Sequence, residues 1–153
     1  PGLRFKRHSQ STRDTNMAVS TTDSYQETLT DIETTLGFVP GFMEAVPDDA
    51  LIHEWPIFKR YTLDETVIPP KYRELMQLAV AATQKCQYCE AFHTAAAGMH
   101  GATDDELVET GTLASLTTRW SAMIHAQQYD YDTFVDEVHQ IGAFVQDQSQ
   151  AGD

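Results

Sequence analysis

The sequence predicts an all-α protein, and two observations carry that prediction. Along most of the chain, apolar residues recur every three or four positions, which is the spacing of one face of a helix. Alternating apolar and polar residues, which would indicate strands, are sparse, and no internal repeat is visible. At 153 residues with 41% hydrophobic content, the chain is long enough to bury a core. We therefore expect a bundle of six or seven helices in a single domain at residues 17–153.

Two helical segments are predicted near the start of this domain. Residues 22–36 carry apolar side chains at helical spacing. Thr22 or Asp23 can cap this helix, and Gly37 is a typical residue to end it. A short helical turn follows at residues 41–46, between two prolines.

The third predicted helix contains a proline. Asp48 or Asp49 can cap it, and it extends to Tyr61, with apolar residues on one face. Pro56 falls inside this run. Because proline has no N–H and its ring crowds the preceding turn, we expect a kink there.

A pair of helices occupies the middle of the chain. The Ile-Pro-Pro sequence at residues 68–70 interrupts the preceding segment and suits the start of a helix at residues 71–84. The chain must then turn near residues 83–85. A second helix follows at residues 87–99, and its many alanines allow a neighbouring helix to approach closely.

A longer helical region begins in the last third of the chain. Thr103 and Glu106 form the sequence pattern of a capping box, so a helix should begin at Asp104. Gly111 and the threonines near it predict a break. The helix would then resume at residues 113–128.

The last predicted helix is amphipathic and ends near residue 146. Asp130 or Asp132 can cap it. Its apolar stripe consists of Phe134, Val138, Ile141 and Val145. Apolar stripes on several helices exceed what one small bundle needs to bury internally, so we expect a homo-oligomer.

The chain is strongly acidic. Its formal net charge is −13, and four of its ten lysines and arginines lie within residues 1–16. A negative surface repels phosphate groups, so we expect neither nucleic-acid binding nor docking on an anionic membrane. Such self-repulsion is tolerable where salt screens it. We therefore interpret the composition as that of a protein from a salt-loving (halophilic) organism.

The first residues do not look like a targeting signal. Residues 1–16 are basic and polar and have no apolar segment of the kind that secretory signals require. We expect them to be a disordered leader or a cloning remnant, with Met17 as the natural start. No stretch approaches the roughly 18 apolar residues of a membrane-spanning helix. We therefore expect a cytoplasmic protein.

Both cysteines of the chain lie in one CxxC motif. In a protein without an export signal, the spacing of Cys86 and Cys89 suits either a redox dithiol or half of a metal site. If a helix begins near Lys85, both thiols lie in its first turn, where unpaired N–H groups stabilise a thiolate. This position favours redox use and makes Cys86, the residue nearer the helix start, the candidate nucleophile.

A histidine lies one helical turn after the motif. His93 is four residues beyond Cys89, so its imidazole can exchange a proton with that thiol directly or through a water molecule. A carboxylate normally orients such a histidine. Glu74 and Glu90 are both candidates, and the sequence leaves the choice between them open.

These residues together resemble a known signature. Glu74, an interval of eleven residues, the pair Cys86 and Cys89, and His93 after three more are similar to the motif of AhpD-type alkylhydroperoxidases, in the carboxymuconolactone decarboxylase-like family. The resemblance implies an AhpD-like helical fold. It also implies an antioxidant peroxidase or thiol–disulfide oxidoreductase of peroxiredoxin type, with a Glu74–His93 proton relay.

The resemblance also implies roles and partners. Cys89 would attack a hydroperoxide and become a sulfenic acid, and Cys86 would supply a proton and close the disulfide. Between the two candidate nucleophiles we follow the resemblance and expect Cys89 to attack first. The oxidant would be a hydroperoxide or a partner protein's disulfide, the reductant an external dithiol, and the assembly a trimer or hexamer. The best-known members have a histidine where this chain has Tyr88, which removes one proton carrier. Tyr88 is a secondary candidate, as a proton donor, a pocket wall or a packing residue.

Three other functions compete with this interpretation. A zinc site would use Cys86, Cys89 and His93 with His100 or His53 as a fourth ligand, provided that the motif lies outside a helix. A decarboxylase-like or isomerase-like enzyme would use only the acid–base pair. A non-catalytic oligomeric protein would use neither. On a helix, Cys86, Cys89 and His93 are spread over about 10 Å and do not converge on one ion, so we expect no metal. We expect no cofactor, because no flavin, haem or nucleotide motif is present. No phosphate-binding loop is formed by the glycines from residue 37 to residue 111. These are Gly37, Gly41, Gly98, Gly101 and Gly111.

Overall fold

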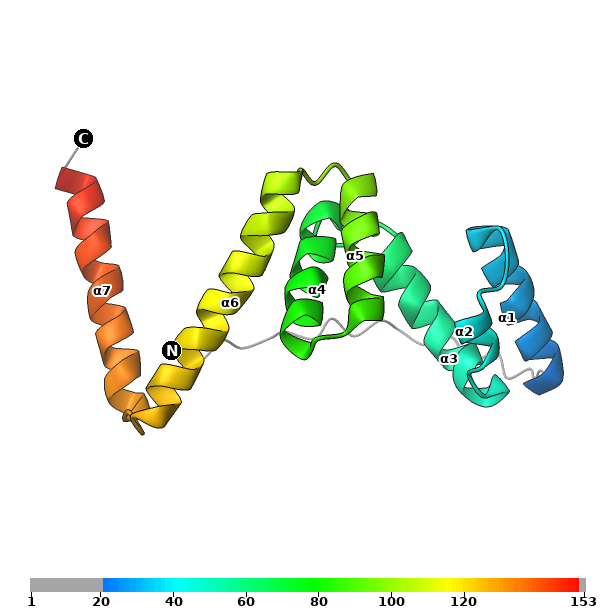
Figure 1. The fold of residues 1–153 in the computed structure, drawn as a ribbon, viewed down its shortest axis with the longest axis horizontal. Coiled ribbons are helices and arrows are strands. Elements are labelled where there is room, and N and C mark those ends of the chain that lie inside the picture. Colours follow the sequence, from blue (N-terminus) through cyan, green and yellow to red (C-terminus); the bar gives the residue numbers. More distant parts are fainter. Residues whose placement is uncertain (1–20, 152–153) are drawn as a thin grey trace, which may run out of the picture. The chain divides into compact units, whose positions relative to one another are not determined.

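The computed structural model describes residues 21–151, and every regular element in this part of the chain is a helix (Figure 1). This confirms the all-α class and the expected six or seven helices. The expectation for residues 1–16 lies outside the described residues. The elements are α1 (Thr21–Leu36), α2 (Gly41–Glu44), α3 (Asp48–Phe58), the π-helix η1 (Lys59–Leu63), α4 (Pro70–Gln84), α5 (Gln87–Met99), α6 (Asp104–Ala126) and α7 (Tyr131–Ala151).

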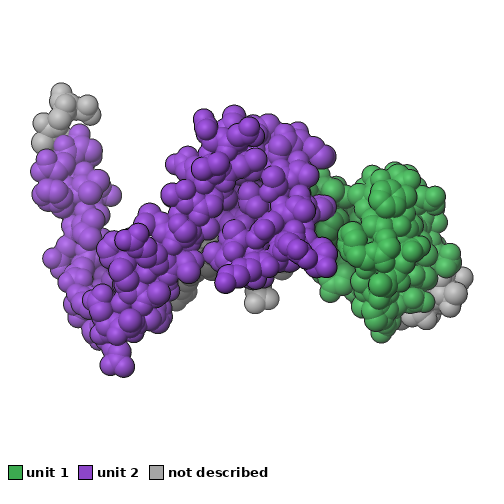
Figure 2. Space-filling model, in the orientation of Figure 1, with its two compact units in different colours: residues 1–64 green, residues 65–153 purple. Residues whose placement is uncertain are grey.

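The described residues divide after Asp64 into two compact units (Figure 2). In the first unit, α1 packs against α3 around a small apolar core. Asp31 on α1 joins both following elements: its carboxylate accepts hydrogen bonds from Trp55 Nε1 on α3 at 2.7 Å and from Lys59 Nζ on η1 at 2.7 Å. The buried core residues are Ile32, Met43, Leu51 and Trp55. The single domain at residues 17–153 stays a prediction.

Pro56 does not end its helix. It lies inside α3, which continues to Phe58 and passes directly into η1. The predicted run to Tyr61 is therefore helical, but its last turn is a π-helix. Such short π segments are rare in proteins.

The second unit is built on a hairpin of α4 and α5, which lie side by side (Figure 1). Lys85 ends α4 in the left-handed conformation, with a φ of 57°. The N–H of Cys86 donates to the carbonyl of Ala81 at 3.1 Å, which closes the last turn of α4. The chain therefore reverses within two residues, close to the predicted turn.

Helix α6 packs against α4 and is continuous. The predicted break at Gly111 is wrong. A helical glycine costs only about 1 kcal/mol relative to alanine, and the neighbouring threonines need no break, because their hydroxyls donate to carbonyls four residues earlier. The capping box is confirmed: Glu106 N–H donates to Thr103 Oγ1 at 3.2 Å, and Thr103 N–H donates to Glu106 Oε2 at 2.8 Å.

Helix α7 begins after Asp130, whose Oδ1 accepts from the N–H of Thr133 at 2.8 Å. Asp130 rather than Asp132 is therefore the cap, and the helix extends beyond the predicted end near residue 146. Its apolar stripe is exposed in the isolated chain. Among the described helices, none is both long enough and apolar enough to cross a membrane.

Candidate active site

The α4–α5 hairpin brings a carboxylate to the predicted histidine. Glu74 lies on α4 and is fully buried, with 0% of its surface exposed. Its Oε2 lies 2.8 Å from Nδ1 of His93 on α5. Of the two carboxylates that the sequence left open, Glu74 is therefore the one hydrogen-bonded to this ring.

This pairing is offset from the simplest hairpin register. With the chain reversing at residues 85–86, a level antiparallel pair would place Glu74 opposite Ala97. His93 lies four residues nearer the turn, an offset of about 6 Å along a helix. Both side chains are long, and together with the stagger of the two helices they span this distance.

The structure adds Arg73 to the site. This arginine is buried, with 7% of its surface exposed, and its Nε lies 3.7 Å from Oε1 of Glu74. Its Nη1 donates a hydrogen bond to Oγ1 of Thr66 at 3.1 Å. Sequence reasoning missed Arg73, because neighbouring residues on a helix normally point in different directions. No sequence signal marked Arg73, because the burial of Glu74, which requires a compensating charge, is visible only in the structure.

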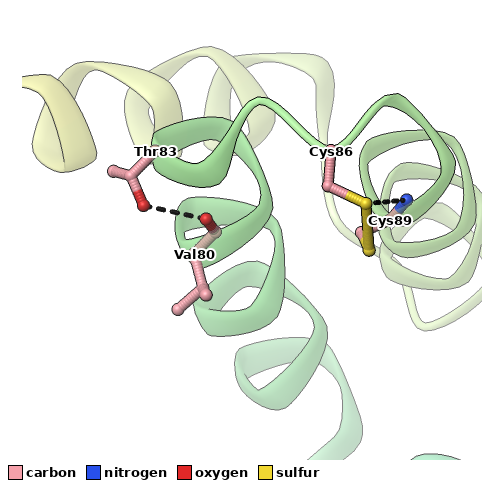
Figure 3. The surroundings of a disulfide bond; sticks show 4 residues. All are labelled: Val80, Thr83, Cys86 and Cys89. Carbon is pink, nitrogen blue, oxygen red and sulfur yellow. Dashed lines mark hydrogen bonds between the residues drawn. A yellow bond between two sulfur atoms is a disulfide. The ribbon is translucent and has the colours of Figure 1, made fainter.

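The two cysteines lie at the start of α5 and form a disulfide, with their Cα atoms 5.3 Å apart (Figure 3). Cys86 is the N-cap residue, and its Sγ accepts a hydrogen bond from the N–H of Cys89 at 3.3 Å. Both cysteines are partly exposed. The expectation that the two sulfurs lie in the first turn of the helix is therefore confirmed.

The two thiols differ in the reduced form. The pKa of Cys86 is lowered, first by the hydrogen bond from the Cys89 thiol and then by the backbone N–H of Cys89. The pKa of Cys89 is raised, first because its hydrogen bond to Cys86 favours the protonated form and then by partial burial. Glu90 opposes ionisation of both thiols through its negative charge. Cys86 is thus the thiol that ionises more easily.

The secondary candidates take different positions. Tyr88 is 80% exposed, so its ring is not packed in the interior of its own chain. Glu90 lies in the first turn of α5 and is partly buried. Phe92 contacts the ring of His93 edge-on, with 5.2 Å between the ring centres.

A metal centre is not assembled in the described part of the chain. Among residues 21–151, no group of three or more histidine, cysteine, aspartate or glutamate side chains could hold a metal ion. His100 lies just after α5, and His53 belongs to α3 in the other unit. The arrangement that is present consists of a disulfide, an imidazole one helical turn away, and a buried ion pair behind the imidazole.

The chain is similar to known proteins in fold and in sequence. The fold is similar to a crystal structure of the alkylhydroperoxidase AhpD core from Rhodospirillum rubrum. The TM-score is 0.63 at 28% sequence identity, and the match covers 74% of this chain and 87% of that one. No curated protein matches the chain. The model of the carboxymuconolactone decarboxylase family matches residues 52–129, about half of the sequence, including the hairpin that carries the site. This chain therefore belongs to the carboxymuconolactone decarboxylase family.

Proposed function

We propose that this protein is a thiol-dependent oxidoreductase of the alkylhydroperoxidase type, which transfers electrons through Cys86 and Cys89. One observation carries the proposal: the CxxC motif at the start of α5 lies one turn before His93, whose ring is hydrogen-bonded to buried Glu74. The similarity to the AhpD core supports it. The oxidant would be a hydroperoxide or a partner protein's disulfide, and the reductant an external dithiol.

The histidine serves Cys89 in this proposal. Because the Glu74 carboxylate accepts a hydrogen bond from the Nδ1–H of His93, the other ring nitrogen is left as the base. Cys89 lies one helical turn away. Its raised pKa keeps it protonated at neutral pH, so it is the thiol that needs a base. Cys86 needs no such base, because the N-terminus of the helix stabilises its thiolate.

This difference favours an order of attack opposite to the one that the resemblance implies. Cys86 has the lowered pKa and receives the N–H of Cys89 on its sulfur. The thiolate is the reactive form of cysteine. We therefore assign the first attack to Cys86 and the closing step to Cys89.

The cycle balances as follows. The Cys86 thiolate attacks the outer oxygen of a hydroperoxide, the O–O bond breaks, and the alkoxide takes a proton from solvent to leave as an alcohol. Cys86 becomes a sulfenic acid. His93 takes the proton of Cys89, whose thiolate attacks the Cys86 sulfur. The S–O bond breaks, hydroxide leaves as water after taking that proton, and the disulfide forms. An external dithiol returns two electrons and two protons.

Two single-cysteine variants test both the activity and the order. With an alkyl hydroperoxide and a dithiol reductant, the wild type should consume peroxide, whereas Cys86→Ser and Cys89→Ser should not turn over. A dione probe that traps sulfenic acids should label Cys86 in Cys89→Ser and leave Cys86→Ser unlabelled. Labelling of Cys89 in Cys86→Ser would reverse the order, and a wild type without any peroxide or disulfide turnover would overturn the function.

A second function uses the same pair without sulfur chemistry. The hydrogen bond between Glu74 and His93 is complete without either thiol, and the family takes its name from a decarboxylase. This pair could therefore act as acid and base on a carbonyl substrate. Alkylation of both cysteines separates the two functions, because it should abolish an oxidoreductase and spare an enzyme of this second kind.

A further inference from the structure

The carboxylate behind His93 is buried in a way that requires a positive charge. Glu74 has no exposed surface, and only its Oε2 is hydrogen-bonded to His93. Its Oε1 is buried and accepts no hydrogen bond from the residues that the structure describes. Removing a carboxylate from water is strongly unfavourable unless a partner compensates its charge. The guanidinium of Arg73, 3.7 Å from Oε1, is placed to supply that charge.

The guanidinium is itself held in place from outside its helix. Arg73 Nη1 donates to Thr66 Oγ1 at 3.1 Å, and Thr66 Oγ1 donates to the carbonyl of Ile68 at 3.3 Å. Thr66 and Ile68 precede α4, and the N–H of Arg73 donates to the carbonyl of Pro69 at 3.1 Å. The segment before α4 therefore fixes both ends of Arg73, its backbone and its guanidinium.

We propose that Arg73, anchored by Thr66, is a positioning residue that aims the Glu74 carboxylate at His93. It acts through Glu74, whose Oε1 lies 3.7 Å from its Nε. The chain Thr66, Arg73, Glu74, His93 then extends the proton relay by two residues that the family signature in this sequence does not contain. The expected effect of Arg73 on turnover rests on the proposed function. The expected effect of Arg73 on the imidazole of His93 does not.

The test follows the imidazole proton directly. In the reduced, full-length protein labelled with ¹⁵N-histidine, the Nδ1–H of His93 should give a downfield NMR resonance that exchanges slowly with water and is absent in His93→Gln. In Arg73→Gln its exchange should accelerate about tenfold, the lower end of the effects seen when such supporting contacts are removed. Arg73→Lys, which keeps the charge, should recover most of the protection. Unchanged exchange in a folded Arg73→Gln would overturn the proposal.

A second pair of variants avoids removing a buried charge. Thr66→Val keeps the shape of the side chain but loses the hydroxyl that holds the guanidinium, whereas Thr66→Ser keeps the hydroxyl. We expect faster exchange and a lower kcat with unchanged KM in Thr66→Val, and values like the wild type in Thr66→Ser. Equal loss of thermal stability in both variants, with the His93 resonance unmoved, would mean that Thr66 and Arg73 only stabilise the fold.

The two proposals fail in different ways. A wild type that turns over neither peroxide nor disulfide, but whose His93 resonance responds to Arg73→Gln and Thr66→Val, would contradict the proposed function and support the positioning role. Normal turnover with an unresponsive resonance would do the reverse.

Discussion

At the scale of single residues, the two thiols of the candidate site differ in their surroundings. Cys86 caps α5 and receives a backbone N–H, whereas Cys89 lies one turn before a histidine. The first is stabilised as a thiolate by the helix end, and the second depends on a base. The difference follows from where α5 begins. Because the helix starts directly after Cys86, that residue caps the helix and Cys89 lies in its first turn.

Selective alkylation tests this difference. In the reduced wild type, Cys86 should react with iodoacetamide before Cys89 at neutral pH. The lowered pKa of Cys86 shifts its alkylation profile to lower pH, and the raised pKa of Cys89 shifts its profile to higher pH. Cys89→Ala, which removes the thiol donor, should move the Cys86 profile upward. Peptide mass spectrometry resolves the two sites, and preferential labelling of Cys89 would contradict the assignment.

At the same scale, the sequence predicted the candidate cysteines and histidine but not the residues that lie behind them. The spacing of the two cysteines and His93 depends only on local helix geometry, so it can be read along the chain. The choice of Glu74 over Glu90 depends on how α4 and α5 are staggered. The part played by Arg73 depends on burial and on a contact with Thr66 outside the helix. Neither property is local.

At the scale of elements, some predicted helix caps are present and others are not. Thr22 and Asp23 lie inside α1, and Pro47 precedes α3 without a side-chain cap. The capping box at Thr103 and Glu106 and the cap at Asp130 are side-chain contacts within four residues, and both are present. The predicted break at Gly111 failed because packing of α6 against α4 stabilises the helix across a residue of low helix propensity.

The capping box offers a stability prediction. Thr103→Ala removes the oxygen that accepts the Glu106 N–H and should lower the free energy of unfolding by about 1 kcal/mol. Thr112→Ala is the matched control, since its exposed hydroxyl bonds within the middle of the same helix. We expect that change to stay within about 0.5 kcal/mol of zero. Urea unfolding of both variants measures the difference, and equal effects would show that the cap contributes nothing.

At the scale of the whole molecule, the isolated chain leaves α7 with an exposed apolar stripe. We expect a homo-oligomer, a trimer or hexamer, that covers this stripe. Ile141→Glu should then shift the assembly toward smaller species, whereas Gln140→Glu, the same added charge one residue away, should not. Sedimentation velocity at matched concentrations gives the result. A monomeric wild type, or equal behaviour of the two variants, would contradict the expectation.

The net charge of −13 leads to a second prediction at this scale. If repulsion among surface carboxylates limits stability, the melting temperature should rise as salt is increased from about 0.1 to 1 M, over which the screening length falls from about 10 to 3 Å. Calorimetry at constant pH, with sodium and potassium chloride compared, would measure the rise. A melting temperature that falls with added salt would exclude the halophilic interpretation.

The central claim is that two sulfurs exchange electrons while His93, held by Glu74, manages their protons. The most direct measurement is the rate at which an alkyl hydroperoxide closes the Cys86–Cys89 disulfide in the reduced protein, followed by rapid quenching with an alkylating reagent and mass spectrometry. We predict closure in the wild type, slowing of about ten- to a hundredfold in His93→Ala and Glu74→Gln, and no slowing in His100→Ala, which changes an exposed histidine at the far end of the same helix. Equal rates in all four proteins, or thiols that stay reduced, would contradict the account.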